Sequence, residues 1–97
     1  MRGEDDMKKV QLDGASCRSQ EELHDQLKTV LHLPDYYGKN LDALWDCLTG
    51  EVNLPVELTW VNFDTSKDAL GEYAESVKQL FQEAEEELKG QFQVSFQ

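Results

Sequence analysis

The chain has 97 residues, of which 39% are hydrophobic and 30% are charged, so it is long enough for one domain with one modest core. Its 20 acidic and 9 basic residues give a net charge of -11. That sign is wrong for direct nucleic-acid binding and for an anionic membrane surface. The composition therefore predicts a small acidic globule and favours a basic protein as its partner.

The sequence has no feature typical of a targeted or membrane-spanning chain. No apolar run near its start resembles a signal peptide, and none approaches the roughly 20 residues of a membrane span, so we expect a cytoplasmic protein. Cys17 and Cys47 lack the paired spacing of a zinc or redox motif, and we expect two free thiols, largely buried. No spacing indicates a metal site, and no cofactor is expected.

The first third of the chain predicts a strand followed by a helix. Residues 8 to 14 alternate Val10 and Leu12 before Asp-Gly, which indicates a short strand and a turn. Ser19 and Glu22 then form a capping box ahead of an amphipathic helix that ends at Pro34. The apolar stripe of this helix consists of Leu23, Leu27, Val30 and Leu31.

The middle of the chain predicts a short helix and a second strand. Asn40 is a suitable cap for a helix of about ten residues, and Gly50 is placed to end it in the left-handed conformation. Residues 54 to 61 then alternate apolar and polar side chains, which predicts a strand with one buried face. The inward side chains of that strand are Val56, Leu58 and Trp60.

The last third predicts two more helices and a final strand. A short helix is expected from Asp64 to Leu70, closed at Gly71, and the longest helix from Glu72 to about Lys89, ended by Gly90. Residues 91 to 97 alternate again and predict a strand. Helical crossovers between successive strands imply an α/β fold, with a three-stranded parallel sheet and about four helices packed on one face.

The second helix points its acidic and apolar residues in opposite directions. Asp42 and Asp46 lie about 40° apart around the helix axis, and Trp45 falls on the boundary between the two faces. The core stripe on the other side consists of Leu41, Leu44 and Leu48. The result is an acidic surface with an aromatic rim, a composition that suits a protein interface.

A purely structural interpretation of this helix is also open. Asp42 suits the positive end of the helix dipole, Asp46 can be merely solvated, and Trp45 can be a core residue with a wet edge. Against it, like charges four residues apart cost a few tenths of a kcal/mol in a helix. Tyr36 and Tyr37 also come just before the helix, and tyrosine is a common interface anchor.

Residues 33 to 50, LPDYYGKNLDALWDCLTG, resemble the barstar family of intracellular inhibitors of the secreted bacterial ribonuclease barnase. The resemblance continues through SKDAL and AESVKQLFQEA, residues 66 to 70 and 74 to 84. It covers residues 8 to 97 as a single domain and leaves residues 1 to 7 as an N-terminal extension. It implies the same fold and a 1:1 complex between a chain that is monomeric when free and a basic, barnase-type ribonuclease.

The resemblance also implies the residues that meet the partner. Asp46 would fill the site of a substrate phosphate, Asp42 would face a neighbouring basic group, and Glu83 would add an acidic contact from the longest helix. Glu51 stands where the family has a tryptophan, and Leu54-Pro55 matches a bond that is cis in the family. The expected partner-binding residues are Tyr36, Tyr37, Gly38, Asn40, Leu41, Asp42, Trp45, Asp46, Thr49, Gly50, Glu51 and Glu83.

Two other functions compete with ribonuclease inhibition. An enzyme would use Asp42 and Asp46 as an acid–base pair with His24 or His32, but both histidines fall among charged residues on the first helix, with no nucleophile arranged nearby. We therefore expect no catalysis. The second alternative is a barstar-like interaction module for a different basic partner that is not a nuclease, and the sequence does not separate it from an inhibitor.

Overall fold

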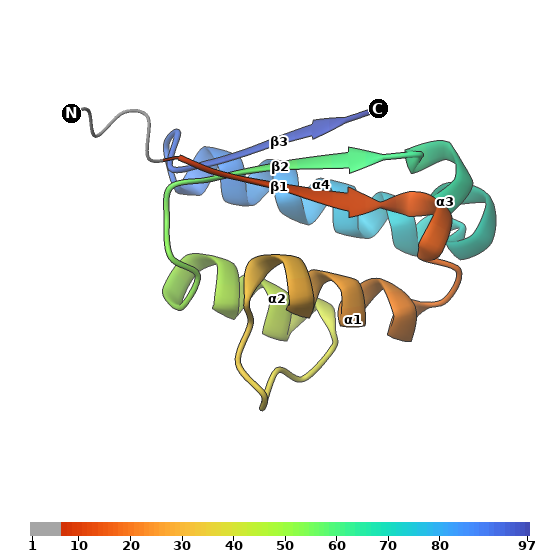
Figure 1. Cartoon of the computed structure of the whole chain (residues 1–97), viewed down its shortest axis with the longest axis horizontal. Helices are drawn as coiled ribbons and strands as arrows, with labels where there is room; N and C mark the ends of the chain where they lie inside the picture. The colour runs from red at the N-terminus through yellow and green to blue at the C-terminus, as the bar shows by residue number, and fades with distance from the viewer. Residues whose placement is uncertain (1–6) are drawn as a thin grey trace.

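A computed structural model describes residues 7–97 and has the expected order of elements (Figure 1). The strands are β1 (Lys8–Asp13), β2 (Val56–Val61) and β3 (Phe92–Phe96). The helices are α1 (Gln20–Leu31), α2 (Leu41–Gly50), α3 (Phe63–Leu70) and α4 (Glu72–Glu87), with a 3-10 turn, η2 (Gly14–Ser16), after β1. The predicted extension, residues 1 to 7, lies outside the described residues except for Met7. Among the helices described, none has the length and apolar character to cross a membrane.

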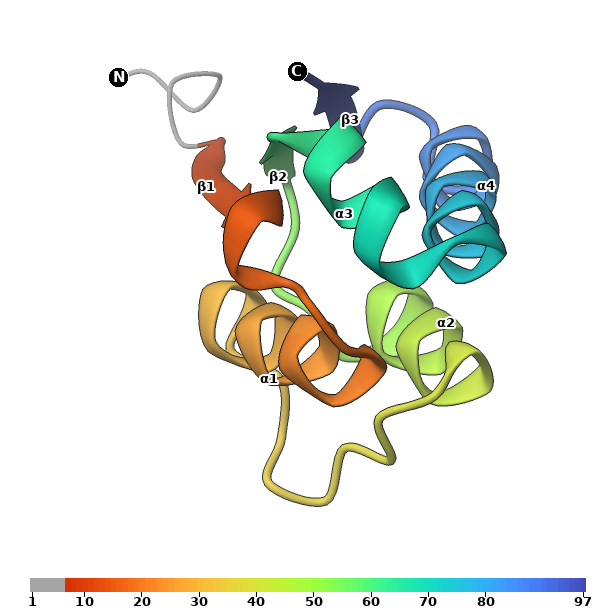
Figure 2. The same ribbon diagram turned by 90° about the vertical axis from the view of Figure 1, so that its right-hand side faces the viewer.

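The three strands form a parallel sheet in the order β1-β2-β3, with β2 in the centre. Figure 2 views the strands nearly end-on and shows all four helices on the same side of the sheet. On the helix side, Leu58, Trp60 and Phe92 are fully buried, whereas Gln93 and Ser95 on the opposite side of β3 are exposed. The prediction of a sheet covered on one face only is therefore confirmed.

Trp60 is the centre of the core at the carboxyl end of the sheet. Its ring packs edge-on against Phe63, with centroids 4.8 Å apart, and against Phe81 at 6.0 Å. Its indole N–H donates to Ser66 Oγ at 3.0 Å, and the Ser66 hydroxyl donates to the Gly14 carbonyl at 2.9 Å. Because both polar side chains are buried and paired, this chain of bonds fixes α3 against the turn after β1 without leaving an unsatisfied group.

The predicted start of α1 is confirmed with one difference in its cap. Ser19 Oγ accepts from the Glu22 N–H at 3.1 Å, as a capping box requires. The Glu22 carboxylate, however, accepts from the N–H of Arg18, one residue before the cap, at 3.0 Å. The helix ends before Pro34, where His32 takes the left-handed conformation with φ 56°.

The prediction that Gly50 ends α2 in the left-handed conformation is wrong. Gly50 is the last helical residue, and Glu51 follows it as the C-cap with φ -125°. The N–H groups of Glu51 and Val52 both donate to the Cys47 carbonyl, each at 2.9 Å, so the end of the helix is satisfied without a left-handed residue. The chain then reaches β2 through Leu54-Pro55, which is a cis peptide bond.

Candidate functional site

Helix α2 presents its two aspartates to solvent from a well-capped start. Asn40 Oδ1 accepts from the Ala43 N–H at 2.8 Å, which satisfies one of the free N–H groups of the first turn. Asp42 and Asp46 are both exposed, while Leu44, Cys47 and Leu48 on the other side of the helix are buried in the core. The predicted separation of acidic and apolar faces is confirmed, and the helix gives the two carboxylates a fixed spacing.

Trp45 and Leu41 lie at the edge between these faces. Trp45 is half-buried, as its position around the helix predicts, and Leu41 is half-buried although it was expected in the core stripe. Leu41 packs against the edge of the core from the first turn of α2 and lines the groove between α2 and α4. Thr49 and Gly50 are exposed in the last turn, and the Thr49 hydroxyl donates to the Trp45 carbonyl at 2.8 Å. The apolar edges of these side chains therefore border the carboxylates.

Helix α4 brings Glu83 to the same surface. An open groove of about 230 Å³ runs between α2 and α4. Its lining residues are Leu41, Asp42, Trp45, Ser76, Gln79, Leu80 and Glu83. Gln79 Nε2 donates to Glu83 Oε2 at 3.2 Å, which limits the rotamers open to that carboxylate. Glu83 and Asp42 thus lie on the two walls of one groove, and their juxtaposition is the one that the family resemblance implied.

The segment before α2 is tied down at several points. Lys39 pairs with Asp25 of α1 at 2.6 Å, and Asn40 Nδ2 donates to the Gly38 carbonyl at 3.2 Å. The Tyr36 hydroxyl donates to the Glu51 carboxylate at 2.6 Å, which links this loop to the far end of α2. The Tyr36 ring is nonetheless 74% exposed, so the loop holds a large aromatic surface in the solvent beside the helix.

Tyr37 differs from its neighbour, because the structure buries the side chain that the sequence placed at the interface. Only 6% of Tyr37 is exposed, and its hydroxyl forms a 2.5 Å hydrogen bond with His24 Nδ1. His24 Nε2 forms a 2.6 Å bond with the hydroxyl of Tyr73 on α4. Tyr37 therefore anchors the loop to α1 from the core side, and its side chain does not form part of the exposed surface.

His24 was expected among charged residues and is instead fully buried between the two tyrosines. Burial lowers the pKa of His24, since the charged imidazolium would lose its hydration. Burial also raises the pKa of Tyr73. The sequence signal for this arrangement was available in part, since His24 lies seven residues before Leu31 and hence on the apolar side of α1. A histidine enclosed in this way positions its neighbours and has no access to a substrate.

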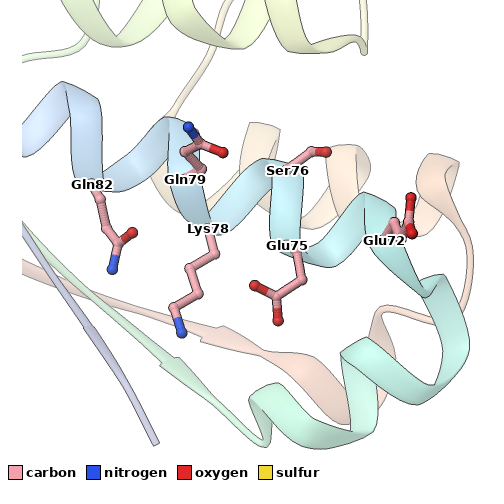
Figure 3. Close-up of a pocket in the computed structure, with 6 residues that line it drawn as sticks. All are labelled: Glu72, Glu75, Ser76, Lys78, Gln79 and Gln82. Atoms are coloured by element: carbon pink, nitrogen blue, oxygen red, sulfur yellow. The ribbon is translucent and has the colours of Figure 1, made fainter.

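The outer surface of α4 carries a hollow without convergent chemistry. A hollow of about 740 Å³ is lined entirely by residues of this one helix (Figure 3). In Figure 3, Ser76 and Gln79 point towards one side of the helix and Glu75, Lys78 and Gln82 towards the other. The Lys78 ammonium lies 5.2 Å from the centre of the Phe63 ring. These side chains do not surround a common point, and within residues 7–97 no group of three potential ligands can hold a metal ion.

The site is therefore a convex protein surface with a shallow groove. Within it, the hydrogen bond to the Glu51 carboxylate raises the pKa of the Tyr36 hydroxyl. The structure brings together ten of the twelve expected residues as exposed or half-buried neighbours of α2, and Asn40 acts as the cap of that helix while remaining exposed. Tyr37 is the one residue of the twelve whose side chain is buried in the core. A direct role of these residues in binding stays a prediction.

Comparison with known proteins shows the family of the chain. Residues 7–97 match the family described as "Barstar (barnase inhibitor)". A protein of Bacillus subtilis (strain 168) named "Putative ribonuclease inhibitor YrdF" is 53% identical over 88 residues, which are 91% of this chain and 97% of that protein. The members of this family are inhibitors and not enzymes. The chain belongs to the barstar family.

Proposed function

We propose that this protein is a stoichiometric inhibitor of a basic, barnase-type ribonuclease, and that it covers the active site of the enzyme in a 1:1 complex. Family membership and the relative from Bacillus subtilis support a ribonuclease-inhibitor role. The observation that supports the active-site mechanism is the exposed pair Asp42 and Asp46 on a capped helix, with Glu83 across the groove. We further propose that binding takes place in the cytoplasm, before the enzyme is exported.

The chemistry of RNA cleavage explains why carboxylates on a rigid helix suit this role. A ribonuclease must hold cationic groups around the phosphate to stabilise the charge of the transition state. Carboxylates at fixed positions can accept hydrogen bonds from the same groups, with Asp46 at the phosphate site and Asp42 beside it. Because the chain carries a net charge of -11, long-range attraction also guides a basic enzyme towards this surface. No cofactor takes part.

The proposal is tested by titrating RNA cleavage by a barnase-type ribonuclease with the wild-type protein. We expect complete inhibition near one equivalent. Asp46→Ala should lose it, whereas the control Glu57→Ala should retain it, since Glu57 lies on the sheet face opposite the helices and carries the same charge. Raising the salt concentration from about 50 to about 500 mM should slow association, because screening shortens the reach of the charges.

The opposite results are equally informative. Full inhibition by Asp46→Ala would place the centre of the interface elsewhere on the surface. Failure of the folded wild-type protein to inhibit would contradict the proposed target and favour the alternative, a basic partner that is not a nuclease. An association rate that ignores salt would contradict electrostatic guidance by the acidic surface.

A further inference from the structure

Glu51 occupies a position that folding alone does not favour. It is the C-cap of α2, where the helix dipole places partial negative charge, so a carboxylate there is unfavourable for the helix. The last turn of α2 contains no basic residue. The ion pairs among residues 7–97 also leave Glu51 out, since they join Lys28 to Asp35, Lys39 to Asp25, and Lys67 to Glu75.

What does hold the Glu51 carboxylate is Tyr36, fifteen residues earlier. The Tyr36 hydroxyl donates to Glu51 Oε1 at 2.6 Å, and the bond raises the pKa of Tyr36. An ionised carboxylate can accept about four hydrogen bonds, so this contact leaves most of its capacity free. The Tyr36 ring is 74% exposed, and its hydroxyl proton is already committed to Glu51. The pair therefore faces outward as an aromatic face next to an acceptor of hydrogen bonds.

We propose that Tyr36 and Glu51 form a preformed subsite for an arginine side chain of the inhibited ribonuclease, and that this subsite selects among basic enzymes. The inference rests on the proposed function. A guanidinium group is planar, stacks on an aromatic face and donates to a carboxylate in the same pose, which a lysine ammonium does less well. The subsite lies beyond the end of α2, apart from the two aspartates, so it reads a different part of the enzyme surface.

The bond between the two residues prepares the subsite before binding. A free tyrosine and a free glutamate would each lose rotamer freedom when the complex forms, and the hydrogen bond removes part of that loss in advance. Tyr36 comes from the loop before α2 and Glu51 from the residue after it, so the pair also joins the two ends of the acidic surface. An enzyme with an apolar side chain at this point would desolvate the Glu51 carboxylate and leave it only the Tyr36 hydroxyl as a donor, at a cost to affinity.

An arginine scan of a barnase-type ribonuclease tests the subsite. Neutral residues around the rim of the enzyme's active site are replaced singly by arginine, and each variant's dissociation constant is measured with wild-type protein, Glu51→Gln, Tyr36→Phe and the control Glu57→Gln. We expect at least one arginine to tighten binding to the wild type about tenfold, the size of one charge-assisted hydrogen bond. Glu51→Gln should abolish that gain, Tyr36→Phe should reduce it, and Glu57→Gln should keep it.

A tyrosine titration of the free protein provides an independent reading. Glu51→Gln should lower the pKa of Tyr36, because it removes the carboxylate that raises it. The titration step of Tyr36 is assigned as the one that disappears in Tyr36→Phe. The subsite proposal would be overturned if no introduced arginine tightened binding, or if the gain in affinity persisted in Glu51→Gln. The proposed function would still hold in either case if inhibition depended on Asp46. Failure of the wild type to inhibit any enzyme of the scan would overturn both.

Discussion

Replacing Tyr37 with phenylalanine removes one hydroxyl and keeps the ring that packs in the core. The change breaks the 2.5 Å bond to His24 and leaves a buried imidazole nitrogen without that partner. A buried polar group that loses its partner costs about 1 to 3 kcal/mol. Tyr37 is 6% exposed and His24 fully buried, so water has little access to the orphaned nitrogen and we expect the upper part of this range.

Urea unfolding followed by circular dichroism measures this loss. We expect a lower midpoint with an unchanged slope, and a melting temperature lower by about 4 to 8 °C for each kcal/mol in a domain of this size. Tyr36→Phe is the matched control, since it deletes the same atom from the adjacent residue at an exposed site. Its stability should stay within about 0.5 kcal/mol of the wild type.

The reasoning also links stability to binding. Tyr37 holds the loop that carries Tyr36 towards the exposed surface, so Tyr37→Phe should weaken ribonuclease binding even though its side chain is not exposed. Equal unfolding midpoints for Tyr37→Phe and the wild type would refute the argument, because they would show that the buried bond contributes nothing. Equal losses in Tyr37→Phe and Tyr36→Phe would refute it too, since burial would then make no difference.

Three further predictions concern the core. Burial lowers the pKa of His24 below its ordinary value of 6.5, so the unfolded chain binds more protons than the folded one. The free energy of unfolding should therefore fall as the pH drops below about 6.5. His24→Gln should lose this pH dependence in urea unfolding experiments. Gly14→Ala should destabilise the fold by about 1 to 3 kcal/mol in the same assay. The added Cβ would collide with the carbonyl oxygen of Val61, at 2.6 Å, and with that of Asn62. Burial raises the pKa of Cys17 to about 11, so iodoacetamide at pH 8 should modify it only as fast as the chain unfolds, and rapid labelling of folded protein would contradict the burial.

The elements that local patterns encode were predictable from the sequence. The cap at Asn40 and the alternation of β2 each depend on residues a few positions apart, and the structure has both where the pattern placed them. The free, buried state of Cys17 and Cys47 followed from composition and spacing. The prediction for Gly50 was wrong because the Cys47 carbonyl at the end of α2 accepts from the N–H of Val52, a residue outside the helix that no propensity singles out.

Contacts between distant residues explain what the sequence did not show. Tyr36 and Tyr37 are neighbours of the same type, yet one is 74% and the other 6% exposed. The difference depends on His24, thirteen residues before Tyr37, and on Tyr73, which lies on a different helix. Periodicity places His24 on the apolar side of α1 but cannot choose its partners, because several polar side chains are compatible with that side until the helices are packed together.

The distribution of cations argues that the acidity of α2 serves binding and not solubility alone. Lys28, Lys39 and Lys67 form ion pairs with acids outside this helix. Among residues 7–97, these ion pairs give no cation to the carboxylates of α2 or of Glu51. Like charges four residues apart and a carboxylate at the C-cap are both unfavourable for a helix. A sequence optimised only for its own fold would place a cation beside them. Under the proposed function, the charge that completes this surface belongs to the cationic phosphate site of the inhibited enzyme.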